Sequence, residues 1–116
     1  MSNMCDLHVD IKLGYKDFIR LIRDICGGTE KGRNVYCDWG DFYISNNDSY
    51  SWIRKRRKED GFLYYKFIIE VYPKMPESVF DDFVNTLRNF ISVLKEKGAK
   101  VVPVGDYEDE LNTKGR

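Results

Sequence analysis

Apolar and polar residues alternate without interruption over residues 5–13. The apolar positions are the odd ones: Cys5, Leu7, Val9, Ile11 and Leu13. Successive side chains of a strand point to opposite faces of its sheet, so a period of two places these residues on one face. The pattern predicts a strand with one buried face over this range.

After Gly14 the apolar residues recur every three or four positions, which is typical of an amphipathic helix with one buried stripe. The stripe consists of Tyr15, Phe18, Ile19, Ile22, Ile25 and Cys26. We expect Gly27 and Gly28 to end this helix in left-handed conformations. A short polar loop is expected over residues 29–33.

Two strand-like runs, residues 34–39 and 42–44, surround the dipeptide Gly40-Asp41. Gly-Asp suits a type II′ turn, so the pattern predicts a hairpin, although one long strand with a bulge at Gly40 fits it as well. The polar residues 46–49 predict a turn.

Residues 62–72 carry the strongest strand pattern of the chain. One face is wholly apolar, with Leu63, Tyr65, Phe67, Ile69 and Val71. The other face is mixed, which predicts a central strand that is partly covered on both sides. Pro73 and Pro76 are expected to end the strand, because proline has no N–H for the ladder.

A second helical stripe predicts a helix over residues 77–97, with Gly98 as its stop. Residues 99–104 predict a last strand, placed at a sheet edge by Pro103. The resulting order is β-α-β-β-β-α-β. It predicts an α+β fold: a two-layer sandwich whose mostly antiparallel sheet carries two helices on one face, with ferredoxin-like pairing as the closest familiar topology.

The length of 116 residues fits a single domain, residues 1–116, large enough to fold without a metal or a disulfide. Lys and Arg total 19 and Asp and Glu total 19, so any charge effect must be local. The three cysteines have no metal-ligand spacing, and residues 1–10 lack the features of a signal peptide. We therefore expect a reduced, cytoplasmic protein, with apolar runs far shorter than the ~20 residues of a membrane span.

The chain carries no recognisable catalytic motif. Its one histidine, His8, occupies a polar position of the first predicted strand. The sequence Gly-Gly-Thr-Glu-Lys-Gly at residues 27–32 resembles a phosphate loop, but it follows a helix, whose C-terminal end repels phosphate. We expect neither enzymatic activity nor a cofactor.

The densest basic run is Arg54, Lys55, Arg56, Arg57 and Lys58, with Tyr50 and Trp52 just before it. Cations that contact phosphates, next to aromatic rings that stack on bases, are typical of nucleic-acid binding. A solvated linker or edge strand is the alternative, because the acidic residues 59–60 follow at once.

An acidic segment lies near the C-terminus, with Asp106, Glu108, Asp109 and Glu110. Tyr107 and Leu111, four residues apart, are expected to anchor this segment on the domain and so hold its carboxylates in place. Asp38 and Asp41, on either side of Trp39, could add to an acidic surface or hold Mg²⁺ or Ca²⁺, but they match no ordered metal loop, and we expect no metal site.

Residues 38–41, residues 62–65 with 69–70, and residues 101–111 resemble segments of small single-domain bacterial proteins of unassigned function. In size and α+β build these are similar to immunity proteins that neutralise toxins. The resemblance implies a non-enzymatic protein-binding module that occludes a toxin partner. The residues expected at its acidic and aromatic surface are Asp38, Trp39, Asp41, Asp106, Tyr107, Glu108, Asp109 and Glu110. The alternative function is a nucleic-acid-binding regulatory protein that uses Trp52, Arg54, Lys55, Arg56, Arg57 and Lys58.

Overall fold

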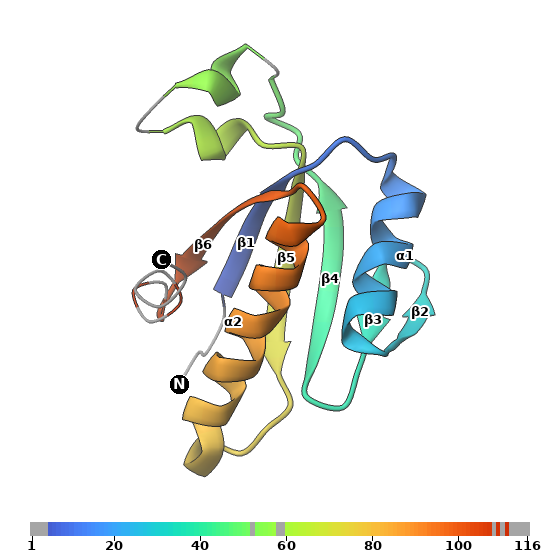
Figure 1. Ribbon diagram of the computed structural model, residues 1–116, viewed down its shortest axis with the longest axis vertical. Helices are drawn as coiled ribbons and strands as arrows, with labels where there is room; N and C mark the ends of the chain where they lie inside the picture. Colours follow the sequence, from blue (N-terminus) through green and yellow to red (C-terminus); the bar gives the residue numbers. More distant parts are fainter. Residues whose placement is uncertain (1–4, 52, 58–59, 108, 110, 112–116) are drawn as a thin grey trace.

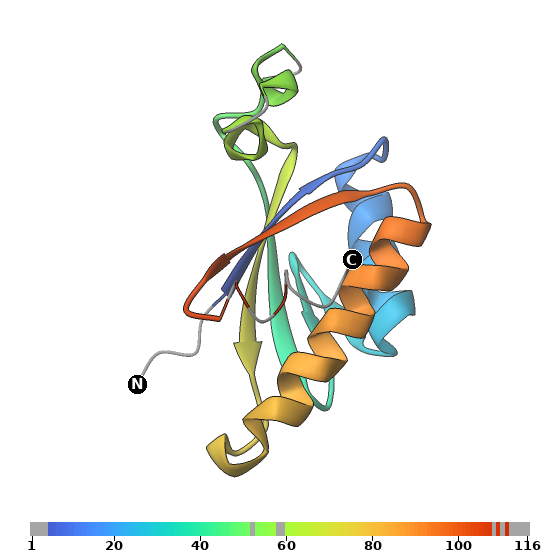
Figure 2. The ribbon, with the colours of Figure 1, turned by 60° about the vertical axis from the view of Figure 1, so that its left-hand side comes forward.

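The computed structural model describes residues 5–51, 53–57, 60–107, 109 and 111. Within this part of the chain an antiparallel sheet forms one layer, and both helices cover one of its faces to form the other (Figures 1 and 2). The predicted α+β class and two-layer arrangement are confirmed.

Six strands pair in the order β2-β3-β4-β5-β1-β6 among the described residues. Their bounds are β1 Cys5–Asp10, β2 Thr29–Lys31, β3 Asn34–Tyr36, β4 Gly40–Asn46, β5 Phe67–Pro73 and β6 Lys100–Gly105. The helices are α1 Tyr15–Cys26 and α2 Phe80–Glu96, and short 3-10 helices cover Arg54–Arg56, Gly61–Tyr64 and Glu77–Val79. Strands β4, β5, β1 and β6 have the ferredoxin-like order, and β2 and β3 extend it beyond β4.

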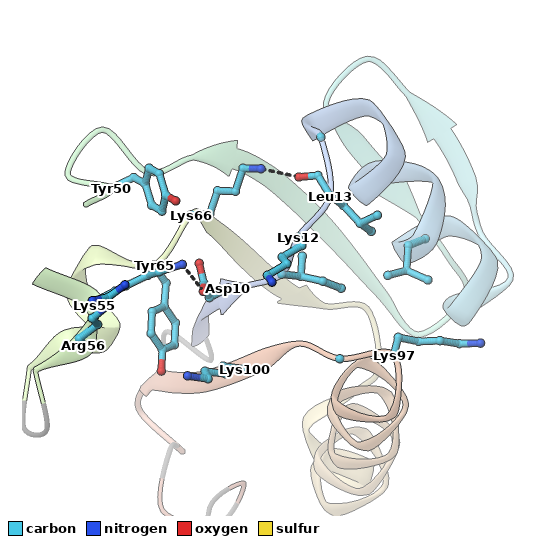
Figure 3. A pocket seen from close by; sticks show the side chains of 14 residues that line it. Asp10, Lys12, Leu13, Tyr50, Lys55, Arg56, Tyr65, Lys66, Lys97 and Lys100 are labelled. Atoms are coloured by element: carbon cyan, nitrogen blue, oxygen red, sulfur yellow. Dashed lines mark hydrogen bonds and ion pairs between the residues drawn. The ribbon is translucent and has the colours of Figure 1, made fainter. Parts of the chain in front are cut away.

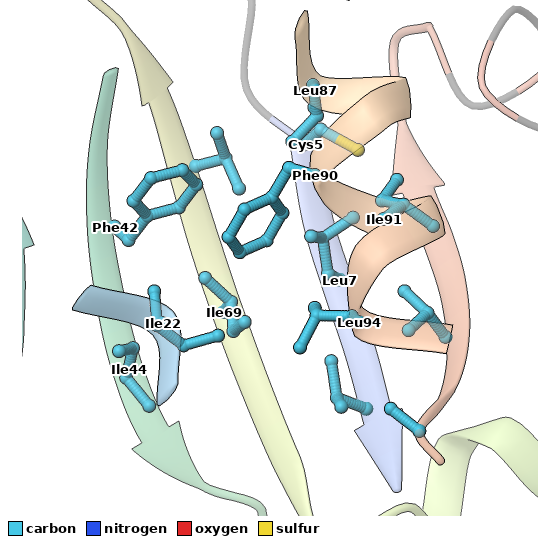
Figure 4. Close-up of a cluster of buried hydrophobic side chains, with 14 of the residues drawn as sticks. Cys5, Leu7, Ile22, Phe42, Ile44, Ile69, Leu87, Phe90, Ile91 and Leu94 are labelled. Atoms are coloured by element: carbon cyan, nitrogen blue, oxygen red, sulfur yellow. The ribbon is translucent and has the colours of Figure 1, made fainter. Parts of the chain in front are cut away.

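The core lies between the helices and the facing side of the sheet (Figure 4). Strands β1 and β5 alternate buried and half-buried residues along their length, as a strand with one covered face should. The rings of Phe18 on α1 and Phe67 on β5 stack with their centroids 4.3 Å apart, and both side chains are fully buried. Phe42 and Phe90 stack in the same way between β4 and α2, at 4.9 Å.

Helix α1 has the predicted bounds and ends at Gly27, whose φ of 65° is left-handed. The expectations for the next residues were wrong in two respects. Gly28 is not left-handed; a Cβ there would lie 2.6 Å from the Tyr36 carbonyl oxygen, so it permits a close approach of the backbones. Residues 29–31 form strand β2 instead of a loop, because they pair with β3.

Strands β3 and β4 form the predicted hairpin, and the single bulged strand is excluded. The turn was placed wrongly. It spans residues 37–39, where the Cys37 N–H donates to the Gly40 carbonyl oxygen at 3.1 Å. Gly40 and Asp41 belong to β4, where they pair with Pro73 and Tyr72 of β5.

The strand predicted over residues 62–72 exists only in its second half, as β5. Gly61–Tyr64 is a 3-10 helix, and Leu63 is 44% exposed. Residues 47–51, 53–57 and 60–66 form a projecting segment beyond one end of the sheet (green in Figure 1). The Asn47 side-chain amide holds the base of this segment by donating to the carbonyl oxygens of Leu63 and Tyr65, at 2.9 and 2.7 Å. Strand β5 is central, between β4 and β1, as predicted.

The C-terminal elements follow the prediction closely. A 3-10 turn, Glu77–Val79, leads into α2, and Gly98 follows the helix with a φ of 97°. Strand β6 is an edge strand and contains Pro103. No helix in the described part of the chain is long and apolar enough to cross a membrane.

Candidate anion-binding cavity

A cavity of about 1090 Å³ opens between the projecting segment and one end of the sheet (Figure 3). Its lining is strongly basic, and we call it the basic cavity. Asp10 is the one carboxylate among the described residues that line it. The lining cations are Lys12, Lys55, Arg56, Lys66, Lys97 and Lys100.

The antiparallel register brings these cations together from distant parts of the chain. Asp10, at the end of β1, faces Lys100 at the start of β6, and Val9 faces Phe67 at the start of β5. One end of the sheet therefore collects Lys12, which follows β1, and Lys66, which precedes β5. The 3-10 helix Arg54–Arg56 contributes Lys55 and Arg56 from the projecting segment.

Two of the lysines have partners within the cavity wall. The Lys55 ammonium lies 2.8 Å from Asp10 Oδ2, and this hydrogen bond raises the pKa of Lys55. Lys66 donates to the Leu13 carbonyl oxygen at 2.6 Å. Lys12 and Lys100 have no ion pair with any described carboxylate. Figure 3 shows Lys12, Lys55 and Lys100 around Asp10, while the Lys97 amine extends away. The cavity therefore holds more positive charge than its own carboxylate can neutralise.

Two tyrosines complete the wall of the cavity. Tyr50 is 42% exposed, and the Lys55 ammonium lies 5.5 Å from its ring centroid. Tyr65 is half-buried, and burial, with Asp10 as a further cause, raises the pKa of its hydroxyl. The Tyr65 phenol is therefore neutral at pH 7. Each tyrosine offers a ring face and a hydroxyl to a ligand.

The predicted basic run is divided between two environments. Lys55 and Arg56 line the basic cavity. Arg54 and Arg57 lie against the Tyr64 ring, 5.6 and 5.8 Å from its centroid. Arg57 also pairs with Asp60, at 3.6 Å. Trp52 and Lys58 lie outside the described residues.

Only some of the described residues predicted for an acidic and aromatic surface are exposed and without a partner in the domain. Trp39 packs against Phe42, Phe83 and Phe90, with centroid distances of 5.2 to 6.1 Å. Asp41 pairs with Lys74 at 2.8 Å, whereas Asp38 is exposed.

Tyr107 is 3% exposed and packs against Phe80 and Phe83. Leu111 is buried as well, so both residues anchor the C-terminal segment, as expected from their spacing. Because the ring of Tyr107 is buried, it offers no aromatic surface to a partner in this arrangement. Asp106 and Asp109 are exposed, and Glu108 and Glu110 lie outside the described residues.

His8 and the described carboxylates were also candidates for a catalytic or metal site. His8 lies on the uncovered face of β1, where its ring meets the Phe62 ring edge-on at 5.5 Å, and burial lowers its pKa. No group of three or more His, Cys, Asp or Glu among the described residues could hold a metal ion.

The chain matches no protein-family model, no curated protein and no solved structure. The site must therefore be interpreted from its own chemistry.

Proposed function

We propose that the protein binds single-stranded nucleic acid in the basic cavity. The observation that supports this proposal is the convergence of cations from several separate segments on one cavity that also contains Tyr50 and Tyr65. Cations contact the phosphates of a strand, and aromatic rings stack on its bases. Bases are free to stack on a protein ring only where they are unpaired, which favours a single strand over a duplex.

The size of the cavity agrees with this ligand class. About 1090 Å³ is more than a single phosphate needs, and it lies just above the ~300–1,000 Å³ typical of small-molecule sites. An acidic peptide would satisfy the lysines but would gain less from the exposed face of Tyr50. The immunity-type hypothesis has less support, because Tyr107 is buried, Trp39 is half-buried against phenylalanine rings, and Asp41 already pairs with Lys74.

Binding of a fluorescent oligouridylate of about twelve nucleotides, measured by anisotropy against salt, tests the proposal. If about five cations meet phosphates, the logarithmic salt slope is about −3.5, and affinity falls roughly 100-fold between about 50 and 200 mM salt. The variant Lys12→Gln/Lys100→Gln should reduce the slope to about −2. Tyr50→Leu should weaken binding by ~1–3 kcal/mol with the slope unchanged.

The matched control is Lys31→Gln/Lys95→Gln, which removes the same charge from exposed positions outside the cavity. It should bind like the wild type. Equal losses in the two double variants would contradict the proposal. So would equal binding of a polyglutamate of the same charge, since a site for any polyanion needs no base stacking.

A further inference from the structure

Two thiols from separate elements meet at the end of α1 far from the basic cavity. Cys26 is the last residue of α1, and Cys37 follows β3. Both are free thiols. The Cys26 thiol donates to the Arg23 carbonyl oxygen at 3.8 Å and the Cys37 thiol to the Gly40 carbonyl oxygen at 3.1 Å, and each sulfur is near enough to shift the pKa of the other. Two neighbouring cysteines are a potential redox pair, in contrast to an isolated buried cysteine.

The backbone brings the two thiols together through Gly28. A Cβ at Gly28 would lie 3.1 Å from Cys26 Sγ and 2.6 Å from the carbonyl oxygen of Tyr36, the residue before Cys37. Both atoms therefore lie close to the position that a Cβ of residue 28 would occupy. Because glycine has no Cβ, the end of α1 can contact β3 there. The proximity is a consequence of the fold and does not depend on side-chain flexibility alone.

The surroundings of the two sulfurs differ. The neighbouring Cys26 thiol, the backbone hydrogen bonds with Trp39 and Gly40, and the charge of Lys74 lower the pKa of Cys37, against the effect of its burial. The neighbouring Cys37 sulfur, together with burial, raises the pKa of Cys26. Cys37 is thus the nucleophile of the pair and Cys26 the residue that resolves its oxidised form.

Cys26 also gives the pair a route to solvent. It lines a small cavity of about 190 Å³, together with Trp39 and Phe90. Cys37 itself is 7% exposed, so only a small reagent can reach it. Hydrogen peroxide is such a reagent, whereas a bulky disulfide is not.

We propose that Cys26 and Cys37 form an oxidisable dithiol that hydrogen peroxide converts into a disulfide. The Cys37 thiolate attacks one peroxide oxygen, the O–O bond breaks, and the products are a sulfenic acid on Cys37 and, after protonation, water. The Cys26 sulfur then attacks the Cys37 sulfur, the S–O bond breaks, and a second water leaves. In total two thiols lose two hydrogens and one peroxide becomes two waters.

Intact mass spectrometry of the full chain after treatment with hydrogen peroxide tests this proposal. The wild type should lose about 2 Da, regain it with a dithiol reductant, and yield a Cys26–Cys37 cross-linked peptide. The rate of the first step should rise with pH and level off once Cys37 is fully ionised, at a lower pH than for a free cysteine thiol. Cys5→Ser should behave like the wild type, because Cys5 lies in the core on β1.

Two variants separate the roles of the two thiols. In Cys26→Ser the sulfenic acid on Cys37 should persist and react with dimedone, because nothing resolves it. In Cys37→Ser, whose folding is checked by near-ultraviolet circular dichroism, oxidation should slow at least tenfold. A cross-link that involves Cys5, disulfides only between chains, or oxygen addition without a cross-link in the wild type would each overturn the proposal.

Discussion

Phe67 packs β5 against α1 in the core. It is fully buried, and its ring stacks on Phe18 at 4.3 Å. We predict that Phe67→Ala lowers the free energy of unfolding by ~3–5 kcal/mol, through lost burial and a residual cavity. Urea denaturation measures this loss.

Leu63 is the matched control for Phe67. The sequence pattern places both residues on the same face of one strand, yet Leu63 is 44% exposed in the 3-10 helix. Leu63→Ala should therefore change stability by no more than about 0.5 kcal/mol. Similar losses in the two variants would mean that residues 62–66 continue the strand after all.

Asp6 and Glu70 face each other across β1 and β5, on the side of the sheet that no helix covers. Burial, and then the charge of Glu70, raise the pKa of Asp6 above its usual value. The folded state therefore holds this proton more tightly than the unfolded chain, and ionisation of Asp6 lowers stability as pH rises through these two pKa values.

We predict that Asp6→Asn stabilises the protein at pH 7, and that the gain fades as pH falls through the folded-state pKa of Asp6 toward about 3.8. Urea denaturation at a series of pH values checks this dependence. Asp48→Asn, at an exposed turn position, supplies the comparison. A gain that is the same at every pH would show that the charge of Asp6 is not its cause.

At the scale of elements, the sequence predicts well wherever burial on one face decides the structure. Strand β1 and helices α1 and α2 are such elements, and their periodic stripes match the observed buried residues. Strand β2 could not be found in this way. Its three residues are all exposed, so no pattern marks it, and only its pairing with β3 makes it a strand.

Residues 62–66 show why alternation is not sufficient for a strand. The ladders on the two sides of β5 end at Asn46 of β4 and at Val9 of β1, both opposite Phe67, so residues 62–66 have no strand beside them to pair with. The Asn47 amide captures the carbonyl oxygens of Leu63 and Tyr65 instead. The side chain of Asn47 thus provides hydrogen bonds that a neighbouring strand would otherwise provide. The apolar pattern of residues 62–66 contains no sign of this substitution.

At the scale of the whole molecule, the equal numbers of acidic and basic residues conceal an uneven distribution of charge. Lys55 and Arg56 could be identified as site residues from sequence, because the run that contains them is continuous. Lys12, Lys66 and Lys100 could not, because more than thirty residues separate each from the next and only the sheet register unites them. Each lies just outside or at the end of a strand, which is the one signal the chain offered.

Gathering like charges in one cavity opposes folding when no ligand is present. We predict that Lys12→Gln/Lys100→Gln raises the free energy of unfolding by about 0.5 kcal/mol at about 10 mM salt. The gain should largely vanish near 0.5 M salt, where the Debye length is only ~4 Å and repulsion between the lysines is screened. Lys31→Gln/Lys95→Gln removes the same net charge from positions outside the basic cavity, so it should show no such gain. Thermal denaturation against salt compares the two variants. A gain common to both would trace the effect to net charge, whereas a loss at low salt in the cavity variant alone would mean that Lys12 and Lys100 stabilise the fold.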